Sequence, residues 1–407
     1  MPQRLLLFAA TTGYQIRVFA DAARRLGMDL TLATNRCHRL DDPWGDRALP
    51  VKFDRIPQSL DTMRGLEVEG VAAVGDQPAV LAAEAAEMLG VPFHPPAAAR
   101  ACQDKYLARQ LYRAAGMRVP QFFRGSLTDD PVALAGRATY PCVLKPLGLS
   151  ASRGVIRADN PEEFAVAFRR IAKIGERHVQ VESYIPGREF AVEGLVTAGE
   201  FQPLAIFDKP DPLEGPFFEE TIYVTPSREP GAVQEALLAT TSRAVRALGL
   251  RHGPVHAELR YNQEGAWMLE SHARPIGGLC AKALRFAGGI PLEELILRHA
   301  VGEDVSRTSL DGPASGVMMI PIPKGGIYES VEGADRAAAV PGVEDVIVTA
   351  KPGQRLVPLP EGSSYLGFLF ARADSPAEVE RALRHAHAEL RFHIATALDT
   401  LKPTPGA

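Results

Sequence analysis

Cysteine is scarce in this chain of 407 residues, and the four that occur form no CxxC pair. Cys37, Cys102, Cys142 and Cys280 are too widely spaced for a zinc site or a disulfide framework, which predicts a reducing, cytoplasmic environment. The net charge is only -4 and the isoelectric point about 6.2, so neither a nucleic-acid nor a membrane partner is expected. The opening apolar run, residues 5–10, is too short to cross a bilayer and predicts a first β-strand, not a signal sequence.

Two common catalytic signatures are also missing. The chain has no GxxxxGK[ST] phosphate loop and no GxSxG nucleophile motif, so neither a P-loop nor a hydrolase-type serine is available. Cys280, which follows Gly278 and Leu279, is interpreted as a packing residue. Chemistry on phosphates or acyl groups therefore has to use other side chains.

Strand and helix patterns alternate at the start of the chain. The expected elements are strands at residues 5–10, 30–33 and 71–74, and helices at residues 14–26 and 79–89. Asp76 is expected to cap the second helix. This order predicts a small doubly wound α/β domain with a parallel sheet over residues 1–95. The turn at residues 11–15 is either a ligand contact at a helix N-terminus or a simple tight turn.

Two more regions follow, divided at about residue 305. The first, residues 96–305, contains most of the charged motifs. The second, residues 306–407, shows three strand patterns and a last helix that opens with the capping box Ser375-Pro376-Ala377-Glu378. Residues 306–407 are therefore expected to form an α+β domain.

A pair of glutamates in a predicted hairpin is the most informative feature. Apolar and polar residues alternate along residues 255–260, the pattern of a half-buried strand. If residues 263–265 form a three-residue loop closed by glycine, positions whose numbers sum to 528 face each other, and Glu258 faces Glu270. Carboxylates about 5 Å apart at Cβ repel each other. A fold that keeps such a pair is expected to hold a cation between them, Mg²⁺ or alternatively Mn²⁺. Two solvated surface acids are the alternative.

A cation follows the second glutamate on the same strand face. Arg274 is suited to clamp a phosphate bidentately beside the metal. Gly277 and Gly278 come next and have no side chains, so they are expected to leave room beside Arg274 for a substrate. The sequence therefore predicts a phosphate clamp next to a moderately roomy pocket.

Two lysines precede this hairpin in the chain. Lys105 lies on a predicted helix, and Lys145 ends an apolar strand just before the loop Gly148-Leu149-Ser150-Ala151-Ser152-Arg153-Gly154. Such a loop presents backbone N–H groups, the hydroxyls of Ser150 and Ser152 and the charge of Arg153 to phosphate oxygens. Either lysine alone is most often a solvated surface residue. Together with the hairpin, the loop is interpreted as a phosphate flap.

A further acidic segment is suited to a nucleoside. The order Glu182-Ser183-Tyr184-Ile185 places a carboxylate and backbone groups where they can read a purine edge, with apolar residues to stack on the ring. Glu189, just past Pro186-Gly187, is expected to accept hydrogen bonds from ribose hydroxyls.

This ordered set of residues resembles the ATP-grasp superfamily, and the resemblance covers essentially the full chain. It implies α/β and α+β architecture: an N-terminal doubly wound α/β domain, a two-part ATP-grasp core with antiparallel sheets over residues 96–305 (lid about 120–185), and an α+β C-terminal domain. By resemblance, ATP phosphates are bound by Lys105 and Lys145, adenine by Glu182, Tyr184 and Ile185, ribose by Glu189, and magnesium by Glu258 and Glu270.

One position departs from the common pattern. Many members carry asparagine two residues after the second metal glutamate, where this chain has His272. The Glu-Ser-x-Ala-Arg form at residues 270–274 is similar to L-amino-acid ligases. That branch implies ATP-dependent activation of a carboxylate to an acyl phosphate and attack by an amine, with Lys145 and Arg274 as the catalytic cations. The alternatives are a carboxylase-type enzyme that activates bicarbonate, a tailoring ligase of secondary metabolism, and an inactive nucleotide-binding regulator.

Substrate contacts are expected near a Pro/Gly-rich loop at residues 208–221. Its acids, Glu219 and Glu220 among them, are expected to hold a substrate ammonium, and Phe217 or Phe218 to wall a side-chain pocket; a solvated loop is the alternative. His272, Gly277 and Gly278 complete the predicted substrate set. The expected partners are a small carboxylate and an amine, most simply two amino acids, and a homodimer is considered for the assembly.

Overall fold

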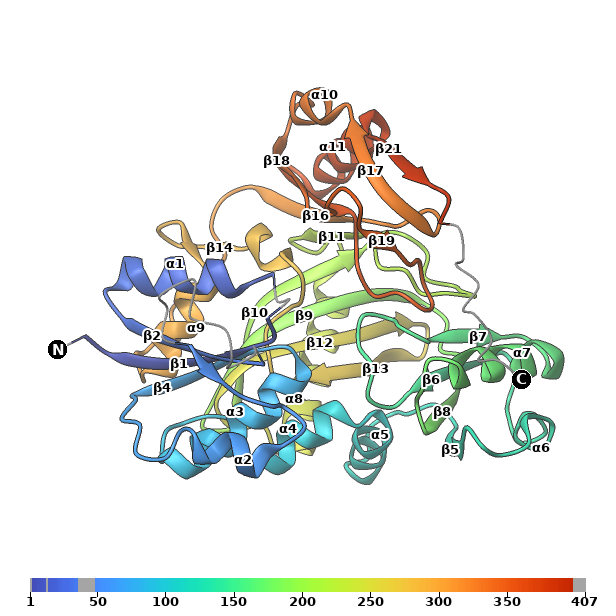
Figure 1. Cartoon of the computed structure of the whole chain (residues 1–407), viewed down its shortest axis with the longest axis horizontal. Helices are drawn as coiled ribbons and strands as arrows, with labels where there is room; N and C mark the ends of the chain where they lie inside the picture. The colour runs from blue at the N-terminus through green and yellow to red at the C-terminus, as the bar shows by residue number, and fades with distance from the viewer. Residues whose placement is uncertain (1, 12–13, 36–47, 398–407) are drawn as a thin grey trace, which may run out of the picture.

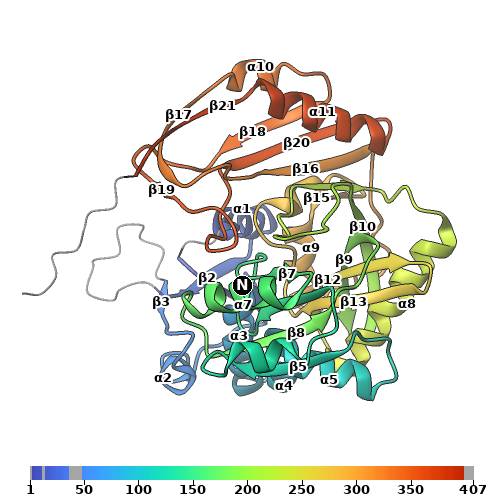
Figure 2. The same cartoon turned by 90° about the vertical axis from the view of Figure 1, so that its right-hand side faces the viewer.

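The computed structural model describes residues 2–11, 14–35 and 48–397. Cys37 and two residues of the predicted turn, Thr12 and Gly13, lie outside these ranges. Figure 1 shows a parallel N-terminal sheet on the left, a long antiparallel sheet through the centre and a small lid sheet on the right. In Figure 2 the C-terminal elements form the upper layer and the lid faces the viewer. Within the described residues, no helix is long and apolar enough to cross a membrane.

The N-terminal sheet lies between two apolar cores. Its elements are β1 (Arg4–Ala9), α1 (Ile16–Leu26), β2 (Asp29–Thr34), β3 (Leu49–Pro50), α2 (Ile56–Asp61), β4 (Gly70–Val74) and α3 (Asp76–Leu89). The strands are parallel in the order β3-β2-β1-β4. Leu6 and Phe8 pack on the side of α3, and Leu5 and Leu7 on the side of α1. Burial on both faces explains why β1 is a continuous apolar run.

Asp76 does not cap its helix. The N-cap of α3 is Gly75, and no side chain makes a capping bond there. The predicted capping role of Asp76 is therefore wrong, because its carboxylate binds side chains of another sheet instead.

The lid is a four-stranded antiparallel sheet with its own apolar core. It contains β5 (Phe122–Ser126), α6 (Pro131–Ala135), β6 (Cys142–Pro146), β7 (Ile156–Ala158), α7 (Pro161–Ala172) and β8 (His178–Ser183), in the strand order β5-β8-β6-β7. Two helices, α4 (Pro96–Gln103) and α5 (Lys105–Ala114), precede it. Asp104 caps α5 by accepting from Tyr106 and Leu107 N–H, which fixes where the Lys105 side chain starts.

The central sheet has eight antiparallel strands in the order β13-β12-β9-β10-β11-β16-β20-β18. Their bounds are β9 (Arg188–Thr197), β10 (Glu200–Lys209), β11 (Ile222–Thr225), β12 (Gly253–Asn262), β13 (Gly265–His272), β16 (Ala314–Ile320), β18 (Val343–Val348) and β20 (Gly367–Ala373). Helix α8 (Gly231–Leu248) covers one side of the β9–β13 half. Because β16, β18 and β20 follow residue 305, the sheet is continuous across the predicted domain boundary.

The remaining elements join the sheets and complete the C-terminal layer. They are η1 (Cys280–Ala283), β14 (Arg285–Phe286), β15 (Ile290–Pro291), α9 (Leu292–Ala300), β17 (Gly326–Glu332), α10 (Ala334–Ala338), β19 (Arg355–Leu356), α11 (Pro376–Glu389) and β21 (Arg391–Ala395). Strands β19, β17 and β21 form a separate small sheet. The predicted capping box of α11 is confirmed, since Ser375 and Glu378 bond each other's backbone N–H.

The hairpin of β12 and β13 differs from the predicted one at its tip. Asn262 pairs with Gly265, so the loop has two residues, and the predicted three-residue loop is wrong. Gly265 has a φ of +108°, so it takes the positive dihedral within the strand and not in the loop. A β-bulge then inserts Leu269 as one extra residue, and Glu258 pairs with Glu270. The facing pair was thus predicted correctly. The predicted loop is one residue longer than the observed loop, and the unpredicted bulge adds one residue to β13, so the two differences cancel.

Candidate active site

The predicted site residues converge on a pocket between the lid and the β12–β13 edge of the central sheet. Of the predicted residues, its lining includes Lys105, Lys145, Ser150, Ser152, Glu182, Ser183, Tyr184, Ile185, Glu189, Glu220, Glu258, Glu270, His272 and Arg274. Glu219, Gly277 and Gly278 are not part of the lining. The structure therefore gathers the nucleotide, metal and cation residues, while their individual roles stay predictions.

Glu258 and Glu270 each keep one carboxylate oxygen free. Lys209 Nζ lies 3.8 Å from Glu258 Oε1, and Lys105 Nζ lies 3.3 Å from Glu270 Oε2. Among the described residues, neither Glu258 Oε2 nor Glu270 Oε1 makes a hydrogen bond, whereas Glu258 Oε1 contacts His256. Burial raises the pKa of Glu270, but the charges of Lys105 and Lys145 outweigh it and hold that pKa below its usual value. Facing carboxylates with free oxygens fit a hard divalent cation such as Mg²⁺.

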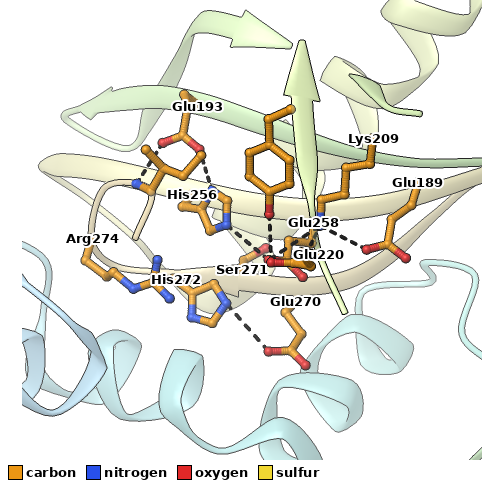
Figure 3. Close-up of polar contacts among 12 residues, drawn as sticks. Glu189, Glu193, Lys209, Glu220, His256, Glu258, Glu270, Ser271, His272 and Arg274 are labelled. Carbon is orange, nitrogen blue, oxygen red and sulfur yellow. Dashed lines mark hydrogen bonds and ion pairs between the residues drawn. The ribbon is translucent and has the colours of Figure 1, made fainter. Parts of the chain in front are cut away.

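A histidine lies behind each of these glutamates (Figure 3). His256 Nε2 is 3.2 Å from Glu258 Oε1, and His272 Nε2 is 3.6 Å from Glu270 Oε2. The two imidazole rings stack with centroids 5.6 Å apart. His256 pairs with His272 across the two strands. Each histidine is two residues from its glutamate, and residues i and i+2 lie on the same face of a strand, so each histidine lies beside its glutamate.

Each imidazole is in turn held by a second carboxylate. His256 Nδ1 bonds Glu193 of β9, and His272 Nδ1 bonds Asp76 of α3 at 2.8 Å. Such outer carboxylates fix the orientation of imidazoles and of the ligands they touch. The sequence did not identify Glu193 or Asp76 as a partner of a site histidine. Each lies more than sixty residues from its histidine and carries no local signal of that contact.

Arg274 is held by Asp76, the first residue of α3. Its Nε donates to Asp76 Oδ1 at 3.0 Å and its Nη2 to Asp76 Oδ2 at 3.4 Å, while Nη1 donates to Pro275 O. Burial raises the pKa of Asp76, but the charges of Arg274 and His272 hold it well below its usual range. The guanidinium is therefore fixed at the pocket by an ionised partner from another part of the chain.

Glu182 is fully occupied by protein cations. Arg109 Nε donates to its Oε1 at 2.6 Å, and Lys145 Nζ lies 2.9 Å from its Oε2. Burial raises the pKa of Glu182, but Arg109 and Lys145 lower it to about 2. The carboxylate thus positions Lys145 in the pocket, and its predicted contact with a purine stays a prediction.

In the rest of the predicted adenine segment, two backbone groups are bonded within the protein and apolar side chains line the pocket. Tyr184 N–H donates to Pro141 O at 2.8 Å, and Ile185 O accepts from Arg260 Nη1 at 2.7 Å. An apolar wall beside this segment is formed by Val143, Val155, Ile185, Phe218 and Leu269. A flat base fits such a wall better than a charged group does.

Lys209 is a site residue that the sequence analysis missed. It was assigned to a loop beginning at residue 208, but it ends β10, so that boundary was wrong. Its Nζ lies 2.9 Å from Glu189 Oε1, bonds Glu220 and lies 3.8 Å from Glu258 Oε1. Oxygens of these three acids lie within 4.8 Å of one another, a spacing that suits a cation. The buried ammonium of Lys209 supplies that charge.

Glu189 and Glu220 are both tied to this lysine. The second oxygen of Glu189 accepts from Arg260 Nε at 2.8 Å, and Tyr223 Oη donates to Glu220 at 2.8 Å. The predicted ribose contact of Glu189 and substrate contact of Glu220 stay predictions. Asp208, also placed in the predicted substrate loop, is buried in β10 and accepts from Ser227 and Arg228, so it does not reach the pocket.

The flap is folded over the pocket. Lys105 Nζ donates to Leu149 O at 2.6 Å, and Gly154 N–H donates to Pro360 O at 2.8 Å. Arg153, predicted to add charge for a phosphate, donates from Nε to Glu361 O at 2.9 Å. The loop is therefore bound both to the core and to the C-terminal layer.

Less space exists beside Gly278 than its missing side chain suggested. A Cβ placed there would lie 3.0 Å from a ring carbon of Phe368, and its φ of +61° favours glycine. A Cβ placed on Gly277 would meet no atom within 4 Å. Burial raises the pKa of Glu219, whose predicted ammonium contact is untested.

Comparisons with known proteins agree with the expected resemblance. Residues 138–283 match the ATP-grasp domain, and residues 318–395 match the L-amino acid ligase C-terminal domain 2. The L-amino acid ligase from Bacillus licheniformis has a similar structure, with a TM-score of 0.81 and 26% identity, over 97% of this chain and 99% of that chain.

Two curated relatives are similar over part of their length. The ATP-grasp enzyme fsqD of Aspergillus fumigatus is 25% identical over 75% of this chain, and the alanine–anticapsin ligase of Bacillus subtilis is 27% identical over 53% of it. The chain spans 62% of the first and 50% of the second. Residues 138–283 are thus similar to the ATP-grasp domain, and the chain as a whole resembles the L-amino acid ligase in structure.

Proposed function

We propose that this protein is an ATP-dependent carboxylate–amine ligase that forms an amide bond between two amino-acid-like substrates, with ADP and phosphate as by-products. The observation that carries the proposal is the facing pair Glu258 and Glu270, each with a free oxygen, beside the pocket cations Lys105 and Lys145. The L-amino acid ligase C-terminal domain supports the amino-acid substrates.

The first step joins a substrate carboxylate to a phosphoryl group. A carboxylate oxygen attacks the terminal phosphorus of ATP, the bond to the bridging oxygen breaks, and ADP leaves. Glu258 and Glu270 would hold Mg²⁺, and the bound ion would neutralise charge at these phosphates. Lys145 adds positive charge that Glu182 holds in place. The flap at residues 148–154 excludes water, which would otherwise hydrolyse the acyl phosphate.

The second step forms the amide. The amine nitrogen attacks the acyl carbon, and the tetrahedral oxyanion that develops is stabilised by the guanidinium of Arg274. Phosphate then leaves with the former carboxylate oxygen, and the nitrogen loses a proton to solvent or phosphate. The hydrogen bond from Arg274 Nε to Asp76 holds the guanidinium in its position at the pocket. No covalent protein intermediate is required, and the three described cysteines are buried and free.

Screening amino-acid pairs for phosphate release that depends on ATP, with mass detection of the condensed product, tests the proposal. Glu270→Ala is expected to abolish release because half of the metal pair is lost. Glu264→Ala is the matched control, since Glu264 is an exposed acid in the turn of the same hairpin. ATP binding without ADP release for any pair, or release that requires bicarbonate alone, contradicts amide formation. So does a Glu270→Ala protein that turns over normally.

A further inference from the structure

Arg109 is a buried cation outside the pocket that no step above uses. It follows Lys105 by one turn of α5, and only 2% of its surface is exposed. Its guanidinium makes three hydrogen bonds, from Nε to Glu182 Oε1 at 2.6 Å, from Nη1 to Met268 O at 2.6 Å and from Nη2 to Leu269 O at 3.1 Å. One side chain thus connects the lid strand β8 with strand β13.

The two carbonyls that Arg109 binds belong to the β-bulge. The pairing of β12 with β13 shifts by one residue between Glu258 and Leu259, and Leu269 is the extra residue. A bulge leaves backbone groups without ladder partners, and buried carbonyls without partners destabilise a fold. Arg109 supplies the missing donors at this point.

The bulge decides which residue faces Glu258. Between the bulge and the turn, the numbers of two paired residues sum to 527, as in Asn262 with Gly265. On the other side of the bulge, where Glu258 pairs with Glu270, they sum to 528. Without the extra residue the 527 pairing would continue, placing Leu269 opposite Glu258 and moving Glu270 to the other face of the sheet. The metal pair therefore depends on the bulge that Arg109 holds.

The third bond of Arg109 reaches the nucleotide side of the pocket. Glu182 receives Arg109 on one oxygen and Lys145 on the other. Lys145 is thus located by a buried carboxylate that Arg109 holds together with Gln180, whose Nε2 also donates to Glu182 Oε1 at 2.6 Å. The same guanidinium supports a phosphate-binding lysine and a metal-binding glutamate.

We infer that Arg109 is a positioning residue of the proposed ligase: it holds the Leu269 bulge that presents Glu270 to the metal, and it holds Glu182 that presents Lys145. It touches neither metal nor nucleotide. The role needs a planar group with donors in several directions, which arginine has and lysine lacks. This inference rests on the proposed function only for the identity of the metal and nucleotide.

Arg109→Lys tests the metal arm. The probe is Mn²⁺, titrated by electron paramagnetic resonance in the presence of a non-hydrolysable ATP analogue and without amino acids. The lysine can still neutralise Glu182 but cannot also hold both bulge carbonyls. Mn²⁺ is expected to bind roughly tenfold or more weakly, the usual effect of losing an outer-shell partner. Unchanged Mn²⁺ affinity in a folded Arg109→Lys protein overturns the inference.

Arg372→Lys is the matched control. Arg372 of β20 also bonds one carboxylate and one backbone carbonyl, those of Glu344 and Pro313, but far from the pocket. Its replacement is expected to leave Mn²⁺ affinity unchanged even if the melting temperature falls. An equal loss of Mn²⁺ affinity in both variants means that general destabilisation is the cause, and overturns the assignment.

Glu182→Gln tests the nucleotide arm and decides the matter if Arg109→Lys does not fold. It leaves the bulge contacts of Arg109 in place but removes the charge that holds Lys145. The Kd for the non-hydrolysable ATP analogue is expected to rise while Mn²⁺ affinity changes much less; an unchanged Kd contradicts the inference. Because metal and nucleotide binding need no amide product, a failure of the ligase proposal leaves this test intact.

Discussion

Mild acid is expected to destabilise this protein through three histidines remote from the pocket. His94 is 1% exposed; its Nε2 donates to Pro254 O at 3.0 Å, and its Nδ1 accepts from Arg251 N–H at 3.2 Å. His252 and His299 stack nearby with centroids 4.0 Å apart. The neutral ring of His94 satisfies both partners, whereas a protonated ring would direct a second N–H at the N–H of Arg251.

The size of the effect follows from the pKa of His94. Burial lowers that pKa from 6.5 to about 4, with a smaller contribution from His252. Between these values the unfolded chain binds a proton that the folded chain refuses, so stability falls as the pH falls from 6.5 towards 4. One pKa unit corresponds to about 1.4 kcal/mol, so His94 alone removes about 2 kcal/mol by pH 5 and about 3 kcal/mol by pH 4. The lowered pKa of His299, also about 4, acts in the same direction.

Urea unfolding followed by circular dichroism at pH 7, 6.5, 6, 5.5 and 5 measures this loss. His94→Gln is the matched variant, because its amide can still donate to Pro254 O but does not titrate. Between pH 6.5 and 5 the wild type is expected to lose about 2 kcal/mol more than His94→Gln, whatever their difference at pH 7. Parallel losses in the two proteins would show that His94 is not the titrating group and refute the reasoning.

Three further outcomes are expected at the site itself. Asp76→Asn removes the charge that holds Arg274 and His272 and should lower kcat by roughly 10- to 100-fold in steady-state assays, together with weaker binding of the metal. Lys209→Met removes the buried cation that Glu189, Glu220 and Glu258 share and should reduce the free energy of unfolding by about 3–5 kcal/mol; Mg²⁺ should raise its melting temperature more than that of the wild type. Gly278→Trp must displace Phe368 and should narrow the range of amino acids that release phosphate; unchanged kinetics for small and large amino acids would contradict this.

The predicted fold was accessible because it depends on local periodicity. The apolar run of β1, the alternation in β12 and the capping box at Ser375 each carry their signal within a few residues, and each gave the observed element. The length of the loop at the tip of the hairpin could not be predicted from such local patterns. Whether a glycine closes a loop or begins a strand depends on packing around the bulge, which Arg109 provides from 160 residues away.

The partners of the site residues were largely invisible for a related reason. Acids and lysines in order along the chain indicated which side chains gather, but not which of them neutralise one another. Glu182 was interpreted as a group that reads a purine, yet its two oxygens are taken by Arg109 and Lys145. The burial that makes such pairing necessary is a property of the assembled sheets and is absent from any short stretch of sequence.

The two halves of the proposed metal pair are supported differently, and this has a mechanical consequence. Glu258 is supported through His256 by Glu193, which lies on the adjacent strand of the same sheet. Glu270 is supported through His272 by Asp76, the first residue of α3, which packs on the N-terminal sheet. A small shift of the N-terminal sheet would therefore move Glu270 and Arg274 together, because both depend on Asp76, and would leave Glu258 in place. The metal ligand and the cation proposed for the oxyanion thus share one anchor, so metal binding and amide formation should respond together to any change at that anchor.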